Sequence, residues 1–92
     1  MSQVSITRSH SLTPSAARER VSHVADRLAE RFGAKCRWQE QVLHIEHDSV
    51  RGHITIEQSV IVVEAKLGFA LSLFRSQLES EIARILDREL GT

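Results

Sequence analysis

From Ala34 to Lys66, apolar side chains recur at about every second position of the chain. Successive side chains of a strand point to opposite faces of a sheet, so this pattern predicts strands with one buried and one solvated face. Tight turns near Glu40-Gln41, Ser49-Val50 and Gln58-Ser59 divide the segment into four strands. Strands joined by such short turns run antiparallel. The sequence therefore predicts an antiparallel meander at the centre of the fold.

The meander also has an expected register, in which apolar side chains of neighbouring strands face each other. The expected pairs are Trp38 with Leu43, Ile45 with Ile54, Ile54 with Val63, and Ile56 with Ile61. A further strand is expected near the N-terminus, because Val4 and Ile6 alternate with polar residues. The resulting sheet of about five strands has as its expected inner face Val4, Ile6, Trp38, Leu43, Ile45, Ile54, Ile56, Ile61, Val63 and Ala65.

Two helices flank the meander. Thr13 is a suitable N-cap and Pro14 a suitable first residue for a helix that ends at Gly33. A second helix is expected from roughly Phe69 to Leu90. Each helix carries one apolar stripe at steps of three and four residues, formed by Ala17, Val21, Val24, Leu28 and Phe32 in the first and by Leu71, Phe74, Leu78, Ile82 and Ile85 in the second.

These patterns predict an α+β fold with two layers, in the order β-α-β-β-β-β-α. Both helices pack on the apolar face of the sheet, because each has one stripe to bury. A chain of 92 residues has enough apolar surface for one core, so residues 1–92 are expected to form a single domain.

Charge and hydropathy argue against several classes of protein. No apolar run approaches the ~20 residues of a membrane span, and Met1 to Ser5 has no features of a secretory signal, which predicts a cytoplasmic protein. Residues 1–35 carry a net charge of +3 and the remainder −3. The basic residues alternate with acidic ones, whereas a nucleic-acid binder needs a concentrated cationic surface. No nucleic-acid partner is expected.

Few residues suggest chemistry. His44, Glu46, His53 and Glu64 are expected on the solvated sheet face, with Glu46 opposite His53 and His53 opposite Glu64. Together they would offer metal ligands, but exposed cross-strand polar pairs are common and are the preferred interpretation. Structural interpretations are also preferred for three other residues. Cys36 is expected to act as a small buried hydrophobe, and His10 and His23 are expected to be solvated. No phosphate-binding, dinucleotide-binding or nucleophile motif occurs. The sequence predicts no catalytic residues, no metal and no cofactor.

The start of the second helix is unusually apolar. On a helical wheel, Phe69 and Leu73 point away from the stripe that covers the sheet. Together with Leu67, they form a candidate apolar contact surface for a second subunit, another apolar surface or the loop after the N-terminal strand. Isolated exposed apolar residues are ordinary in soluble proteins, so local packing that covers both side chains is the alternative.

Several segments resemble the polyhydroxyalkanoic acid system family of small bacterial proteins. They are Ile6-Thr7-Arg8-Ser9-His10, Ala29-Glu30-Arg31-Phe32-Gly33, Trp38-Gln39-Glu40-Gln41-Val42-Leu43-His44, Ala65-Lys66-Leu67-Gly68-Phe69-Ala70-Leu71 and Glu79-Ser80-Glu81-Ile82. The resemblance covers nearly the whole chain, and none of these motifs is a catalytic signature. Relatives tend to have glycine in the first hairpin turn, where this chain has Glu40-Gln41.

The resemblance implies work at polyhydroxyalkanoate storage granules. The leading hypothesis is a non-enzymatic accessory protein that binds the granule, or a granule-associated protein, through the apolar surface of Leu67, Phe69 and Leu73. One alternative is a carrier of a hydroxyacyl chain or another lipid in a cavity between sheet and helix, although a short chain has little volume to spare. The other is a purely structural homodimer.

Overall fold

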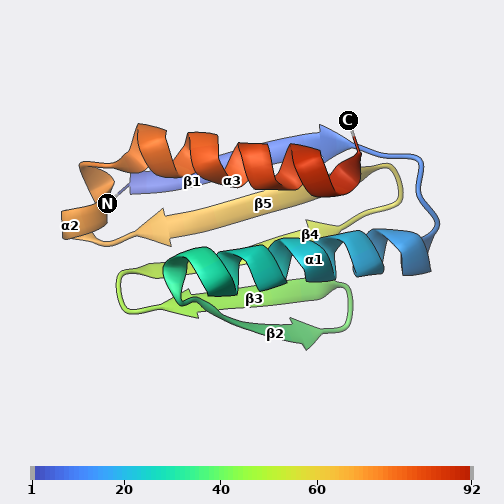
Figure 1. The fold of residues 1–92 in the computed structure, drawn as a ribbon, viewed down its shortest axis with the longest axis horizontal. Helices are drawn as coiled ribbons and strands as arrows, with labels where there is room; N and C mark the ends of the chain where they lie inside the picture. The colour runs from blue at the N-terminus through green and yellow to red at the C-terminus, as the bar shows by residue number, and fades with distance from the viewer. Residues whose placement is uncertain (1, 92) are drawn as a thin grey trace.

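The computed structural model describes residues 2–91 and contains the expected elements, with one additional helix (Figure 1). In chain order, they are β1 (Ser2–Ser9), α1 (Pro14–Phe32), β2 (Lys35–Gln39), β3 (Val42–His47), β4 (Val50–Ile56), β5 (Val60–Leu67), α2 (Phe69–Ser72) and α3 (Arg75–Leu90). Strands β2 to β5 form the predicted meander, and β1 adds antiparallel to β5. The spatial order is β1-β5-β4-β3-β2. Helix α1 therefore connects the two edges of the sheet.

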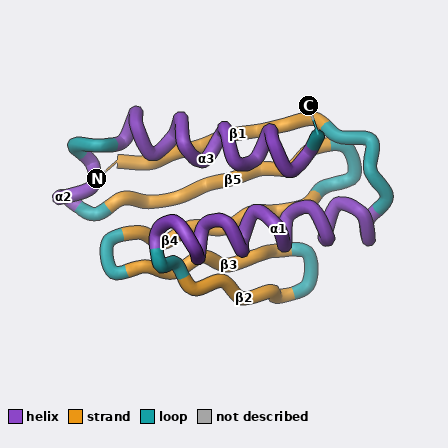
Figure 2. The backbone as a smooth tube through the Cα atoms, viewed as in Figure 1, coloured by secondary structure: helices purple, strands orange, loops and turns teal. Residues whose placement is uncertain are grey.

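Both long helices lie on the same face of the sheet, as predicted (Figure 2). Helix α1 contacts β2 and β4, α3 contacts β1, and the two helices also contact each other. The buried core consists of the alternating residues of the strands together with the stripe of α1. Of the expected inner face of the sheet, only Trp38 is partly exposed. The α+β, two-layer prediction is confirmed.

The register agrees with the prediction in three of its four apolar pairs. Trp38 lies opposite Leu43, Ile56 opposite Ile61, and Ile54 opposite Val63. The expected pairing of Ile45 with Ile54 is wrong, because Ile45 pairs with Gly52 and Leu43 pairs with Ile54. The β3–β4 turn consists of Asp48 and Ser49 rather than Ser49 and Val50. Moving a hairpin turn by one residue changes each pair by two, and a change of two leaves every side chain on its predicted face.

The first hairpin turn contains one residue with a left-handed backbone conformation. Glu40 has a φ of 55°, in the left-handed region that glycine enters without steric cost. The carbonyl oxygen of Glu40 accepts a hydrogen bond of 2.8 Å from Nη1 of Arg18, which also places its guanidinium carbon 4.1 Å from the centre of the Trp38 ring. Trp38 Nε1 donates to Ser22 Oγ over 3.2 Å. These contacts fasten edge strand β2 to α1.

Helix α1 has the predicted ends. Thr13 Oγ1 accepts a hydrogen bond from the amide of Ala16 over 3.2 Å, and Pro14 is the first helical residue. Gly33 ends the helix with a φ of 70°, a conformation that favours glycine. The predicted stripe is buried except for Phe32, which is half-buried.

The prediction of one continuous C-terminal helix is wrong. The chain forms the short α2, breaks at Leu73 and Phe74, and resumes as α3. At the break, the hydroxyl of Ser72 donates to the carbonyl of Phe69 over 2.7 Å, and the amide of Phe74 donates to Leu71 over 2.9 Å. These local bonds satisfy backbone groups at the end of α2 that a continuous helix would pair four residues apart. Helix α3 reaches the core through Leu86, which is fully buried and lies outside the predicted stripe. The stripe residues Leu78, Ile82 and Ile85 are partly exposed.

Candidate functional site

Two of the three residues expected to form an apolar contact surface are strongly exposed. Phe69 is 88% exposed and Leu73 is 78% exposed. The third, Leu67, is only 2% exposed, so its assignment to this surface is wrong. Leu67 is the last residue of β5 and continues the inner set of Ile61, Val63 and Ala65 with the same period of two. This alternation is the signal in the sequence from which the burial of Leu67 could have been predicted.

Phe74 takes the place of Leu67 on this surface. It was expected on the inner stripe of the second helix, but it is 51% exposed. The break between α2 and α3 changes its direction, because Phe74 precedes α3 instead of lying within a helix. Nothing in the helical period indicates this break. We call Phe69, Leu73 and Phe74 the α2 patch.

The α2 patch lies at one end of the molecule, between β5 and α3 (Figure 1). The chain is anchored on both sides of it. Before the patch, the amide of Gly68 donates to the carbonyl of Ser49 over 2.7 Å. After it, Nε of Arg75 donates to the carbonyl of Gln3 over 2.8 Å. The exposed apolar side chains are therefore presented by a segment whose two ends are hydrogen-bonded to the β3–β4 turn and to β1.

An apolar cavity of about 150 Å³ lies beneath α2, between the sheet and the two long helices. Its walls include Leu28 and Phe32 of α1, Leu71 of α2, and Leu78 and Ile82 of α3. Of the residues that line it, only His47 at the rim is both polar and exposed. The sequence offered no direct signal for this cavity, because it is the space left between separate elements.

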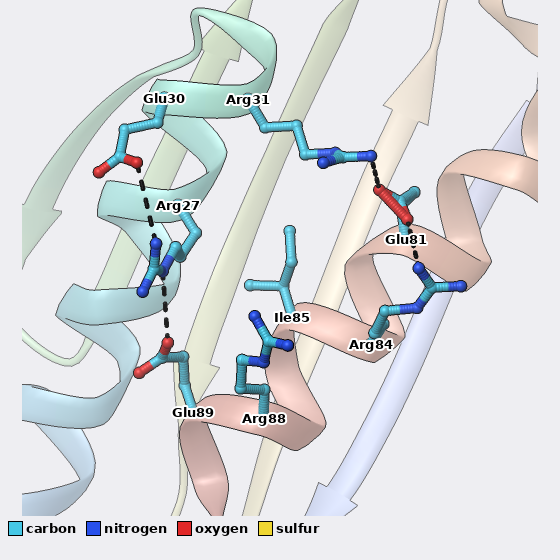
Figure 3. A pocket seen from close by; sticks show the side chains of 8 residues that line it. All are labelled: Arg27, Glu30, Arg31, Glu81, Arg84, Ile85, Arg88 and Glu89. Carbon is cyan, nitrogen blue, oxygen red and sulfur yellow. Dashed lines mark ion pairs between the residues drawn. The ribbon is translucent and has the colours of Figure 1, made fainter.

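A charged groove of about 480 Å³ lies between α1 and α3 on the outer surface (Figure 3). Arg31 Nη2 is 2.6 Å from Glu81 Oε1, and Arg84 Nη1 is 3.4 Å from Glu81 Oε2. On the other side of the groove, Arg27 lies 3.6 Å from Glu89. Most charges of the groove are thus neutralised by neighbouring side chains. The ion pairs across the groove connect α1 with α3.

Of the four residues considered as metal ligands, His44, His53 and Glu64 lie side by side on neighbouring strands, and Glu46 does not join them. His53 Nε2 lies 3.1 Å from Glu64 Oε1, as the predicted pairing of these residues requires. The expected pairing of Glu46 with His53 is wrong, because Glu46 lies opposite Arg51 and His53 opposite His44. Within residues 2–91, no group of three or more His, Cys, Asp or Glu side chains is arranged to hold a metal ion.

Cys36 and His10 both have structural partners. The Cys36 thiol is partly buried, with Sγ 3.9 Å from the carbonyl of Ala25, and burial raises its pKa, with a smaller contribution from Asp26. A raised pKa keeps the thiol protonated and unreactive. His10 was expected to be solvated, but its Nδ1 accepts from the amide of Leu12 over 3.1 Å. Nε2 then carries the proton and donates to the carbonyl of Glu57 over 2.9 Å.

The comparisons with known proteins give one match. The model of the family described as "Putative polyhydroxyalkanoic acid system protein" matches residues 4–90. Neither a curated protein nor a solved structure matches the chain. Within the described part of the chain, every helix is too short or too polar to span a bilayer.

Proposed function

The chain belongs to the polyhydroxyalkanoic acid system family, and from this membership we propose that it is a non-enzymatic accessory protein of polyhydroxyalkanoate granules that attaches to the polyester surface through the α2 patch. The observation that carries the proposal is the exposure of Phe69, Leu73 and Phe74 on one short, anchored segment. Exposing several large apolar side chains to water in one place is unfavourable. Such patches therefore mark sites where another apolar surface makes contact.

The size of the patch favours reversible attachment. If Phe69 and Leu73 are buried fully on contact, they contribute about 3–6 kcal/mol together. A binding free energy of about 4 kcal/mol corresponds to a millimolar dissociation constant. A single molecule therefore exchanges readily between the granule surface and solution.

The attachment is tested in polymer-accumulating cells that express the tagged chain. The wild type, the double variant Phe69→Ser/Leu73→Ser and the control Ala70→Ser are compared by the share of protein that sediments with granules. Ala70 is exposed within the same short helix, so the control alters α2 and keeps both large side chains. We expect the double variant to leave the granule fraction and the control to stay in it.

Two results would contradict the proposal. Equal granule fractions for wild type and double variant, with equal thermal stability, remove the α2 patch from the mechanism. If the double variant instead changes a concentration-dependent dimer measured by light scattering and keeps its granule fraction, the patch is a subunit interface. A further assay measures binding to polyester particles that carry no protein. If the wild type binds these particles and the double variant does not, the patch attaches to the polymer rather than to a granule protein.

A further inference from the structure

The apolar cavity beneath α2 has a built floor. Its centre is formed by Gly52 of β4 and Ala65 of β5, which lie opposite each other on the inner face of the sheet. A Cβ atom on Gly52 would lie 2.7 Å from the backbone oxygen of Glu64 and 3.0 Å from the Cβ of Ala65. The close approach of the two strands thus excludes any larger residue at Gly52. The sheet itself keeps this volume free.

The walls of the cavity are held in place. Leu28 and Phe32 of α1 face Leu78 and Ile82 of α3 across it. Directly beside these residues, the Arg31–Glu81 ion pair joins the two helices with 2.6 Å between Nη2 and Oε1. The structure already contains the cavity, so the protein needs no large movement to accept a ligand there.

The size and chemistry of the cavity select its ligand. Its volume of about 150 Å³ equals that of a protein cavity that binds benzene, a molecule with about six carbon atoms. The walls and floor are apolar, so a chain of methylene groups gains contacts that the empty cavity lacks. Charged or hydrogen-bonding groups would be buried without partners inside it.

The rim offers one polar group for the end of such a chain. His47 is exposed at the edge of the cavity, and its Nδ1 accepts from the amide of Ser49 over 3.4 Å. This bond places the ring proton on Nε2. Nε2 has no hydrogen-bond partner within residues 2–91 and is able to donate to a carbonyl or carboxylate oxygen.

We infer that this cavity binds a short unbranched acyl chain, with the hydrocarbon between the sheet and the two helices and the acyl oxygen at His47. The inference is independent of the proposed granule attachment, because none of the three residues of the α2 patch lines the cavity. A hydrocarbon chain next to an acyl oxygen occurs both in a soluble fatty acid and in a polyester, where an alkyl side chain lies beside the backbone ester, and the experiment below distinguishes these sources.

The probe is a series of unbranched carboxylates from butanoate to decanoate, added at millimolar concentration to the full chain. Methyl NMR spectra report the site. We expect the methyl signals of Leu28, Val63 and Leu71 to shift with saturation, most strongly for hexanoate. A second arm adds protein-free polyester particles with short or long side chains to the saturated protein. Competition by the long-chain particles alone assigns the site to the polymer, and no competition assigns it to soluble acids.

Two variants change the cavity in opposite directions. Ala65→Leu fills the floor, so we expect at least a tenfold loss of hexanoate affinity. Leu78→Ala enlarges the cavity, and we expect its preferred chain to lengthen by two or more carbons, because the substitution removes three carbon atoms from the wall. The control Ala29→Leu adds the same side chain on the exposed surface of α1 and is expected to bind like the wild type.

The expected pattern includes the double variant Phe69→Ser/Leu73→Ser, which should bind hexanoate like the wild type even if it leaves the granules. The inference is overturned if no methyl signal around the cavity shifts, or if the shifts are the same for every chain length. It is also overturned if Leu78→Ala, which retains the core residues of the sheet, leaves the preferred length unchanged. If Ala65→Leu fails to fold, the preferred chain length of Leu78→Ala decides whether the inference holds.

Discussion

Arg8 of β1 and Asp87 of α3 form an ion pair across 79 positions of the chain, with 2.7 Å between Nε and Oδ1 and 3.4 Å between Nη2 and Oδ2. The two-point contact ties the edge strand that begins the fold to the helix that ends it. The hydrogen bond with Asp87 raises the pKa of Arg8, and burial opposes this effect in part. The Asp87 carboxylate thus favours the charged form of the guanidinium.

The first prediction concerns this pair. Asp87→Asn should reduce the free energy of unfolding by about 0.5–1 kcal/mol, because both side chains are more than one third exposed and water screens their attraction. Urea unfolding at low and high salt measures the effect, which should shrink as salt increases. The control Glu79→Gln removes a looser pair within α3, 3.8 Å from Arg75. A loss as large in the control as in Asp87→Asn would show that the contact between β1 and α3 has no special weight.

The second prediction concerns the floor of the sheet. Gly52→Ala should destabilise the protein by about 1–3 kcal/mol, since the new methyl group meets backbone that cannot move without disturbing the β4–β5 pairing. Its nearest contact is Glu64 O at 2.7 Å. In the matched control Gly68→Ala, the nearest atom is Ser49 O at 3.3 Å, which a small shift relieves. The midpoint of denaturant unfolding measures both, and similar midpoints for the two variants would contradict the close approach at Gly52.

The third prediction concerns Cys36 and pH. Burial, and to a lesser extent Asp26, raises the thiol pKa in the folded protein above its ordinary value of 9.0. Above that pH the unfolded chain releases the thiol proton while the folded chain keeps it, so the free energy of unfolding falls as pH rises. Cys36→Ala lacks this group. The stability difference between wild type and Cys36→Ala should therefore change with pH above 9.0 and stay constant below it.

Thiol labelling provides an independent check of the same prediction. A disulfide reagent should modify Cys36 more slowly in the folded protein than in urea, because the thiolate is the reactive form. Equal labelling rates in the two states, or a stability difference that does not depend on pH, would contradict the raised pKa.

The faces of the sheet were predictable to a large extent. Val4, Ile54 and Ile61 lie in the core as their alternation predicts, because the direction of a strand side chain depends only on its place in a local period of two. The ends of α1 were predictable for a similar reason. Thr13 and Gly33 act through bonds and backbone angles within a few residues.

The candidate site was predictable in part. Phe69 and Leu73 are exposed as the helical wheel predicts, whereas Leu67 and Phe74 exchanged their expected places. Leu67 belongs to the end of a strand and follows its period. Phe74 stands at the break between α2 and α3, which the helical period of the sequence does not indicate.

By itself, the sequence determined which side chains turn inward along each strand and along α1, because these directions follow from short periods in the chain. Only the tertiary structure decided that Ile45 pairs with Gly52, that Arg8 meets Asp87, and that a cavity remains beneath α2. A register change of two residues preserves every face, so the alternation cannot distinguish the two pairings. Contacts and cavities between distant elements depend on how those elements fit together, and no local period contains that information.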